Sequence, residues 1–210
     1  MSAGAEALDA EGAIARVAAG GLLGFPTETS WGLGADARSE AALAQLRRWK
    51  GRDAEKPISV LVAGDADLAR LGARMTPAAR RLVAAFWPGP LTLVVRCEAR
   101  LAAGVAGPGG AVGLRCSPHP VAAALAALAL RRGVGPLTAT SLNRSGARAC
   151  ETRAEAEALA GDAIALVSGA DAGRAPASSV VDASGAEPVV LREGAVSGAA
   201  IAAVLAGAPA

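Results

Sequence analysis

Extended and helical patterns alternate along the whole chain. Short apolar runs predict strands at 21–25, 57–63, 91–96, 111–115, 137–140, 163–168, 179–182 and 189–192. Apolar residues at helical spacing, with capping residues before them, predict helices at 5–19, 39–50, from Thr76, at 119–132, from Thr152 and from Ser197. This alternation predicts a single α/β or α+β domain built on a mixed sheet.

The composition suits one domain with a substantial core. The chain has 210 residues, of which 52% are hydrophobic, although alanine supplies much of that fraction. A net charge of +2 is too balanced to predict nucleic-acid binding from charge alone. The most apolar run, 121–130, is half as long as the ~20 residues that a membrane span needs. The acidic N-terminus does not resemble a signal peptide, so we expect a cytoplasmic protein without a membrane segment.

The three cysteines show no metal-binding or redox spacing; they are Cys97, Cys116 and Cys150. Because no Cys-x-x-Cys pair occurs, we expect reduced, partly buried thiols and neither a disulfide nor a zinc site. His119, the single histidine, has no carboxylate or serine partner at a suggestive spacing. We therefore expect it to be a surface or capping residue.

Two polar segments stand where predicted strands should end. Pro26-Thr27-Glu28-Thr29 follows the first strand, and Ser141-Leu142-Asn143 follows the strand at 137–140. Taken alone, each pattern is typical of a turn whose side chains bond to local backbone groups. The functional alternative is a binding site, because ligands of open α/β sheets collect beyond the carboxyl ends of strands.

A cluster of cations lies near one predicted helix end: Arg47, Arg48, Lys50, Arg52 and Lys56. Cations in a last helical turn offset the helix dipole, and Gly51 is typical of the position just past a helix end. A phosphate site needs the same cluster, because arginine offers paired hydrogen bonds and lysine a mobile charge. Arg115 and Arg192 each end a predicted strand, where a solvated terminus is the simpler interpretation, and Ser178 precedes another strand.

Six ordered motifs between about residues 20 and 195 resemble the YrdC family, also called TsaC, of threonylcarbamoyl-AMP synthases. They are Pro26-Thr27-x-Thr29 with Gly32-Leu33-Gly34, Lys50-x-Arg52, Phe86-Trp87-Pro88-Gly89-Pro90-Leu91-Thr92, Ser141-x-Asn143-x-Ser145-Gly146, Ser178-x-Val180-Val181-Asp182, and Leu191-Arg192-x-Gly194. The sequence departs from the family pattern at Glu28, where aspartate is common, at Leu142 in place of alanine, and at Ala149 in place of a serine found in some members.

The resemblance implies a twisted, open sheet with flanking helices and a large electropositive cavity. It implies one YrdC-like domain over 1–210, with its core at about 12–200, and no additional C-terminal domain such as longer relatives carry. The implied enzyme is a nucleotidyltransferase that makes threonylcarbamoyl-AMP and pyrophosphate from L-threonine, bicarbonate and ATP. Mg²⁺ would arrive on the ATP phosphates. The implied partners are the proteins that transfer the threonylcarbamoyl group to tRNA, together with contact to tRNA or double-stranded RNA.

By the same resemblance, three groups of residues form the site. Lys50, Arg52 and Lys56 would serve the phosphates, and Ser141, Asn143 and Arg192 would complete the nucleotide site. Thr29, Arg115 and Ser178 would hold threonine, with Arg115 on its carboxylate. Lys50, Arg52, Ser141 and Asn143 are the expected catalytic residues.

Two other functions remain open from the sequence. One is a non-catalytic paralogue that binds double-stranded RNA or tRNA. The other is a carbamoyl-adenylate-forming domain of hydrogenase maturation, which normally lies in a much longer chain with zinc-finger and acylphosphatase parts.

Overall fold

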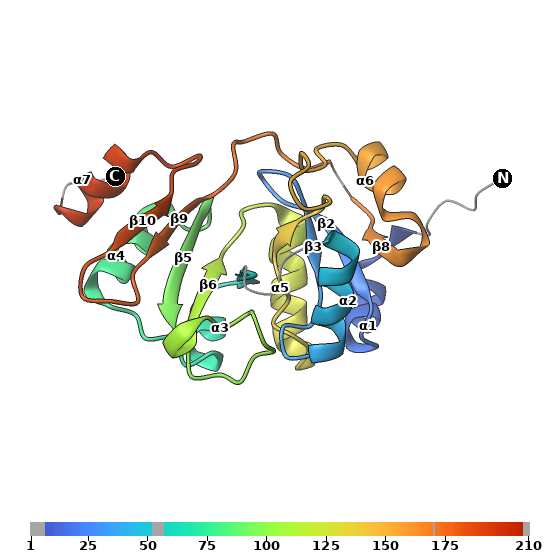
Figure 1. Ribbon diagram of the computed structural model, residues 1–210, viewed down its shortest axis with the longest axis horizontal. Helices are drawn as coiled ribbons and strands as arrows, with labels where there is room; N and C mark the ends of the chain where they lie inside the picture. The colour runs from blue at the N-terminus through green and yellow to red at the C-terminus, as the bar shows by residue number, and fades with distance from the viewer. Residues whose placement is uncertain (1–6, 52–56, 170, 208–210) are drawn as a thin grey trace.

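The computed structural model describes residues 7–51, 57–169 and 171–207 (Figure 1). Its strands are β1 (Ala7–Leu8), β2 (Leu22–Pro26), β3 (Trp31–Gly34), β4 (Val60–Leu61), β5 (Leu91–Arg96), β6 (Ala111–Arg115), β7 (Thr140–Ser141), β8 (Ile164–Val167), β9 (Ser179–Asp182) and β10 (Val189–Arg192). Its α-helices are α1 (Ala10–Ala18), α2 (Glu40–Lys50), α3 (Asp65–Arg70), α4 (Pro77–Phe86), α5 (Pro120–Arg132), α6 (Arg153–Ala160) and α7 (Gly198–Leu205). Short 3-10 turns, Pro108–Gly110 and Gly161–Ala163, precede β6 and β8.

The strands of the described residues form two five-stranded sheets, so the sequence prediction of one sheet is wrong. The first sheet has the order β1-β8-β2-β3-β7, and the second has the order β10-β9-β5-β6-β4. Both sheets are mixed, as predicted, because each contains parallel and antiparallel pairs. The order of elements along the chain cannot reveal this division, because partners such as β2 and β8 lie far apart in sequence.

A buried strip of backbone at 137–139 joins the two sheets. Thr138 donates its backbone N–H to the carbonyl of Ala35 at 2.8 Å, and its hydroxyl accepts the N–H of Ala35 at 2.9 Å. On the other side, the N–H of Leu61 donates to the carbonyl of Leu137 at 2.8 Å. Since Ala35 directly follows β3 and Leu61 belongs to β4, this strip fixes the position of one sheet relative to the other.

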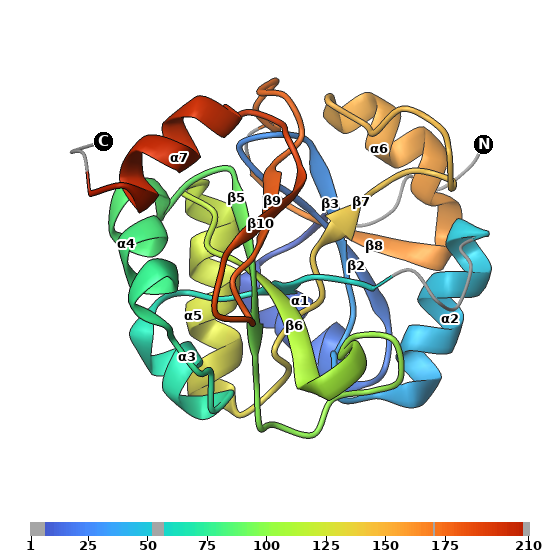
Figure 2. The same ribbon diagram turned by 60° about the vertical axis from the view of Figure 1, so that its left-hand side comes forward.

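Helices flank both sheets (Figure 2). In the first sheet, α1 and α5 pack together on β2, where Phe25 and Leu125 belong to one buried apolar cluster. In the second, α4 packs on β5 and α7 packs on α4, with Leu82 and Ile201 in another cluster. Full burial of a large apolar side chain contributes about 1.5–3 kcal/mol to stability, so these clusters hold the strands in place.

Helix starts predicted from capping residues are confirmed. A side-chain oxygen accepts a backbone N–H of the first turn at each of Ser39, Thr76, Thr152 and Ser197. Glu155 completes the capping box of α6. His119 is a capping residue as expected, because its Nδ1 accepts the N–H of Val121 at 3.3 Å. Side chains within a few residues of each start therefore decide where these helices begin.

Other boundaries differ from the sequence prediction. Helix α1 begins at Ala10, because the Asp9 carboxylate accepts the N–H of Gly12 at 2.7 Å and caps the helix there. Strand β4 is shorter than the strand predicted at 57–63, and β7 is shorter than the strand predicted at 137–140. Strand β3 was not predicted, because Gly32 and Gly34 weaken its strand pattern. The short helix α3 was not predicted either.

No helix in the described ranges is long and apolar enough to cross a bilayer. The cysteines are free thiols, as the sequence predicts. Burial raises the pKa of Cys97 to about 11 and also raises the pKa of Cys116 and Cys150. These thiols are therefore poor candidates for nucleophiles.

Candidate active site

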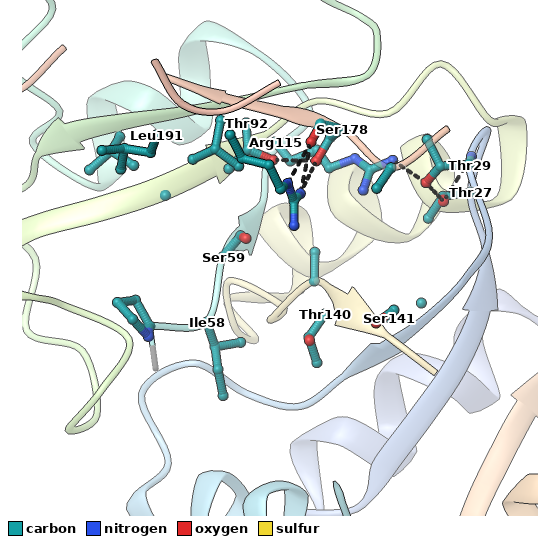
Figure 3. A pocket seen from close by; sticks show the side chains of 18 of the residues that line it. Thr27, Thr29, Ile58, Ser59, Thr92, Arg115, Thr140, Ser141, Ser178 and Leu191 are labelled. Carbon is teal, nitrogen blue, oxygen red and sulfur yellow. Dashed lines mark hydrogen bonds between the residues drawn. The ribbon is translucent and has the colours of Figure 1, made fainter. Parts of the chain in front are cut away.

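A cavity of about 530 Å³ lies between the two sheets (Figure 3). The first sheet contributes residues of β3 and β7 to its wall, and the second contributes residues of β5, β6, β9 and β10. The turn between β2 and β3 and the segment that begins at Pro57 close two further sides. The two polar segments singled out in the sequence therefore reach one cavity from different strands.

The cavity brings together most of the predicted site residues that the structure describes. Those in its lining are Thr29, Arg115, Ser141, Ser178 and Arg192. Lys50 and Asn143 are not part of the lining, but both contact Ser141. Arg52 and Lys56 lie outside the described residues, directly before the lining residue Pro57.

Arg115 stands at the end of β6 with its guanidinium against the turn after β2. Its Nη2 donates to Glu28 Oε1 at 2.8 Å and to Thr29 Oγ1 at 2.7 Å. The second carboxylate oxygen of Glu28 accepts a hydrogen bond from the hydroxyl of Ser117. The Arg115 and Glu28 side chains are 12% and 16% exposed, so this ion pair is largely shielded from water. Arg115 Nε is buried and has no hydrogen-bond partner.

The hydroxyl of Thr29 keeps hydrogen-bonding capacity for a ligand. Thr27 Oγ1 donates its hydrogen to the carbonyl of Ser30 at 2.7 Å and accepts the backbone N–H groups of Thr29 and Ser30, each at 3.3 Å. Both lone pairs of Thr27 Oγ1 are thereby used, so its 3.2 Å contact with Thr29 Oγ1 does not fix the Thr29 hydrogen. Thr29 accepts from Arg115, which leaves one lone pair and the hydroxyl hydrogen for a ligand in the cavity.

Arg192, Ser178 and Thr92 form a second cluster in the lining of the cavity. Figure 3 shows Ser178 and Thr92 side by side. Arg192 donates to the carbonyl of Ser178 from Nε at 3.1 Å and from Nη2 at 2.8 Å, and Nη2 also reaches Ser178 Oγ at 3.2 Å. The hydroxyls of Ser178 and Thr92 are 2.9 Å apart, and only one hydrogen can occupy that contact. The other hydroxyl hydrogen of the pair remains for a ligand.

The guanidiniums of Arg115 and Arg192 repel each other. Burial, and then the charge of Arg115, lower the pKa of Arg192. Arginine nevertheless stays charged at any physiological pH. An anion in the cavity would relieve this repulsion, so the pair favours a negatively charged ligand.

Lys50 organises the segment after β7. Its side chain is buried, and Nζ donates to the carbonyl of Ser141, to the carbonyl of Asn143 at 3.0 Å and to Asn143 Oδ1 at 2.7 Å. Asn143 Oδ1 also accepts from Ser141 Oγ at 2.8 Å. The C-terminal residue of α2 thereby fixes the backbone that presents Ser141 to the cavity.

Sequence reasoning missed three residues beside the site: Glu28, Thr92 and Ser117. Thr92 lines the cavity, whereas Glu28 and Ser117 act on it through Arg115. Thr92 lies within one of the six motifs, which was a usable signal, and Glu28 was visible as a departure from the family pattern. Nothing in the sequence distinguishes Ser117 from a solvated residue after a strand.

The described residues do not form a metal cage. No group of three or more histidine, cysteine, aspartate or glutamate residues among them is placed to hold an ion. Asp182 is the one carboxylate in the described cavity lining, and one of its oxygens already accepts the N–H of Ser184 at 2.8 Å. This donor set fits a divalent cation carried on a phosphate ligand better than a resident metal.

Comparison with known proteins agrees with the motifs. The model of a family named Sua5_yciO_yrdC, described as telomere recombination, matches residues 15–194. A threonylcarbamoyl-AMP synthase of Xanthomonas euvesicatoria is 39% identical over 71% of this chain and 79% of its own length. A threonylcarbamoyl-AMP synthase of Chromohalobacter salexigens is 36% identical over 83% of this chain and 92% of its own.

Solved structures agree with the fold. P. abyssi Sua5 complexed with L-threonine superposes with a TM-score of 0.83 at 30% identity, over 95% of this chain. The match covers 58% of that protein, so this chain spans little more than half its length. With the family model matching most of its length and relatives above 30% identity, the chain belongs to the Sua5/YciO/YrdC family.

Proposed function

We propose that this protein is a threonylcarbamoyl-AMP synthase, which forms threonylcarbamoyl-AMP and pyrophosphate from L-threonine, bicarbonate and ATP. It is a nucleotidyltransferase of tRNA threonylcarbamoyladenosine modification. The observation that supports this most strongly is the meeting of two guanidiniums, Arg115 and Arg192, with several hydroxyls in one cavity wall. This inventory suits two anionic substrates held side by side.

The reaction needs positioning and charge neutralisation more than a protein nucleophile. The uncharged amine of threonine attacks CO₂ and loses one proton to solvent, or attacks bicarbonate with loss of water, and either route forms a carbamate. A carbamate oxygen then attacks the α-phosphorus of ATP, and the bond to the β-phosphate oxygen breaks to release pyrophosphate. The described cavity lining contains neither histidine nor cysteine, and in this proposal its cations offset charge on the substrates.

Two groups of residues divide the substrates in this proposal, and the groups meet where Arg192 contacts Ser178. In this proposal Thr29, Arg115 and Ser178 hold threonine, with its carboxylate on Arg115. Ser141 and Arg192 contact the nucleotide from the lining, and Lys50 and Asn143 position Ser141. The phosphates extend toward Arg52 and Lys56, which precede Pro57 in the sequence. The electropositive character that the resemblance implies for the cavity stays a prediction of this proposal.

Mg²⁺ belongs to this proposal as part of the MgATP substrate, where it shields the phosphate charge. Its ligands would be phosphate oxygens, since the described carboxylates do not gather into a cage. Contact with tRNA or double-stranded RNA, transfer partners, a cytoplasmic location and a single domain over 1–210 stay predictions of the same proposal.

The alternative of a non-catalytic RNA-binding module finds less support. Unpaired bases, such as those in the loops of tRNA, are commonly bound by aromatic side chains exposed next to cations. Trp49, the aromatic residue inside the basic cluster, is buried, and the Arg144 guanidinium covers its ring at 4.3 Å from the ring centroid. This tryptophan is therefore not a free stacking surface.

Pyrophosphate release with substrates omitted in turn tests the proposed function. We expect release from MgATP only when L-threonine and bicarbonate are both present, because the attacking carbamate contains both. Release should stop when either is withheld and should resume when it is added back. ATP turnover that proceeds equally well without L-threonine would remove the assignment, and binding of RNA without any turnover would favour the alternative.

Gly173→Ala should displace the turn at Glu28, which lies beside the proposed threonine-binding residues, although Gly173 is not part of the described cavity lining. A Cβ at Gly173 would lie 2.0 Å from the carbonyl oxygen of Glu28, and the N–H of Gly173 donates to the carbonyl of Thr27 at 2.8 Å. Because backbone cannot yield as a flexible side chain does, we expect a loss of about 3 kcal/mol in stability and a raised KM for threonine.

Gly185→Ala is the matched control, since its nearest neighbour to a new Cβ is 4.0 Å away. Thermal unfolding and the threonine dependence of pyrophosphate release measure both effects. Equal behaviour of the two variants would show that the 171–177 segment does not support the turn at Glu28.

A further inference from the structure

We propose that Glu28 is an internal counter-ion of Arg115 that the carboxylate of the amino-acid substrate must displace. The inference rests on the proposed function, because it concerns the same threonine-binding residues. It assigns a role in setting substrate affinity to a residue that is not part of the described cavity lining.

Both hydrogens on Nη2 of Arg115 are already bound. A guanidinium can grip a carboxylate with two parallel hydrogen bonds in two ways, through Nη1 with Nη2 or through Nε with Nη2. Nη2 is common to both, and it has two hydrogens. One is bound by Glu28 at 2.8 Å and the other by Thr29 at 2.7 Å. A second carboxylate therefore cannot form either fork until one of these partners leaves.

Glu28 is the partner that leaves. An incoming carboxylate repels the Glu28 carboxylate, whereas the neutral Thr29 hydroxyl does not repel it. The repulsion is strong because the site is largely shielded from water. Glu28 also keeps a hydrogen bond after release, because Ser117 donates to its other oxygen. Exchange of one carboxylate for another leaves Arg115 neutralised throughout.

The Nε of Arg115 is the second donor of one of these two forks. It is buried and has no partner, and a buried unpaired donor is costly. A substrate carboxylate in the Nε–Nη2 fork would pair this donor and would take an Nη2 hydrogen that Glu28 or Thr29 now holds. The pairing of Arg115 with Thr92 across β5 and β6 holds the arginine backbone in place during this exchange.

Glu28→Gln should therefore lower stability and raise threonine affinity at the same time. The amide keeps the shape and the contact to Ser117 but loses the charge that competes for Arg115. The ligand-free variant should unfold at a lower temperature, because Arg115 is left buried without a counter-ion. L-threonine should bind roughly fivefold to tenfold more tightly, the difference between a charged and a neutral hydrogen-bond acceptor.

Ser117→Ala should change affinity in the opposite direction. Without the Ser117 hydroxyl, Glu28 has no described partner to retain when it leaves Arg115, so it competes more strongly. We expect threonine to bind roughly threefold more weakly, in line with the loss of one hydrogen bond. If Glu28→Gln does not fold, unchanged or tighter threonine binding in Ser117→Ala would overturn the proposal by itself.

The experiment uses the full chain, with L-threonine binding measured by calorimetry, thermal unfolding with and without L-threonine, and KM values from pyrophosphate release. Two results together support the proposal. Glu28→Gln binds L-threonine more tightly, with a lower KM for threonine and an unchanged KM for ATP, and Ser117→Ala binds L-threonine more weakly. Glu98→Gln is the control, because its ion pair with Arg74 lies at the surface, with Glu98 65% exposed.

A purely structural role for Glu28 predicts that both variants lose stability and that both bind threonine more weakly, so the two accounts differ in the affinity of Glu28→Gln. That result, or unchanged affinity in Glu28→Gln, overturns the proposal while the proposed function stands. Failure of the unmodified protein to bind L-threonine overturns the proposed function, and this inference with it.

Discussion

Lys50→Met is expected to lower the melting temperature by roughly 6–12 °C and to remove most of the activity. The Lys50 side chain is 2% exposed, and its ammonium group is bound by the carbonyls of Ser141 and Asn143 and by the Asn143 amide oxygen. Asn143 Oδ1 keeps its hydrogen bond from Ser141, but the two carbonyls lose a charged donor. Leaving a shielded acceptor unsatisfied costs about 1–3 kcal/mol, so the two together cost on the order of 3 kcal/mol. Each kcal/mol shifts the melting temperature by about 2–4 °C at this chain length.

Arg48→Met is the matched control, because Arg48 lies in the last turn of the same helix with an exposed side chain. Thermal unfolding and pyrophosphate release on both variants separate the two roles of Lys50. A Lys50→Met protein of normal stability that has lost only its affinity for ATP would show that the ammonium serves the phosphates directly and that its contacts to the segment after β7 are secondary.

The structure also changes what Asn143 is expected to do. In the sequence, a turn residue and a nucleotide ligand were separate alternatives. In the structure, Asn143 Oδ1 accepts from Lys50 and from Ser141, and Nδ2 donates to the carbonyl of Ala147. The turn and the presentation of Ser141 to the cavity are therefore one arrangement, so loss of Asn143 should reduce stability and turnover together.

Helix starts and ends that depend on contacts between residues close in sequence were predictable. The capping residues Ser39 and Thr76 accept backbone N–H groups three positions on, so the pattern and the structure share one cause. The glycine after Lys50 takes a left-handed conformation, with φ of 62°, which ends α2 where the pattern predicts. Short-range chemistry of this kind does not depend on the rest of the fold.

The division into two sheets and the inner contacts of the site were not predictable in the same way. Ser117 and Glu28 are 89 positions apart, and Thr92 and Ser178 are 86 apart. In the sequence, each of these is an ordinary polar residue in or beside a strand, and only the folded sheets bring it to its partner. The motifs identified which segments meet, whereas the exchange of partners at Arg115 depends on distances that a sequence does not contain.

The largest expected effect concerns the choice of amino acid. We expect L-threonine to be used best, L-serine measurably and L-valine far less, by as much as ~10⁴ in kcat/KM. Ser178 and Thr92 share one hydrogen in their 2.9 Å contact, so the pair has one hydroxyl hydrogen left for a substrate. A threonine or serine hydroxyl can accept it, whereas a valine methyl leaves it buried and unpaired. A purely apolar wall would separate threonine from valine only weakly.

Arg115→Ala should act on the same substrate through its carboxylate. Loss of a charged fork, at about 1.5–3 kcal/mol for each charged hydrogen bond, should raise the KM for threonine by roughly a hundredfold and leave the KM for ATP much less affected. Arg74→Ala, at an exposed surface pair, is the control. Pyrophosphate release with each amino acid, and with each variant, measures both effects. Valine used as well as serine would mean that no hydroxyl is read in this cavity, and an Arg115→Ala variant that weakens ATP alone would place the nucleotide, and not threonine, against Arg115.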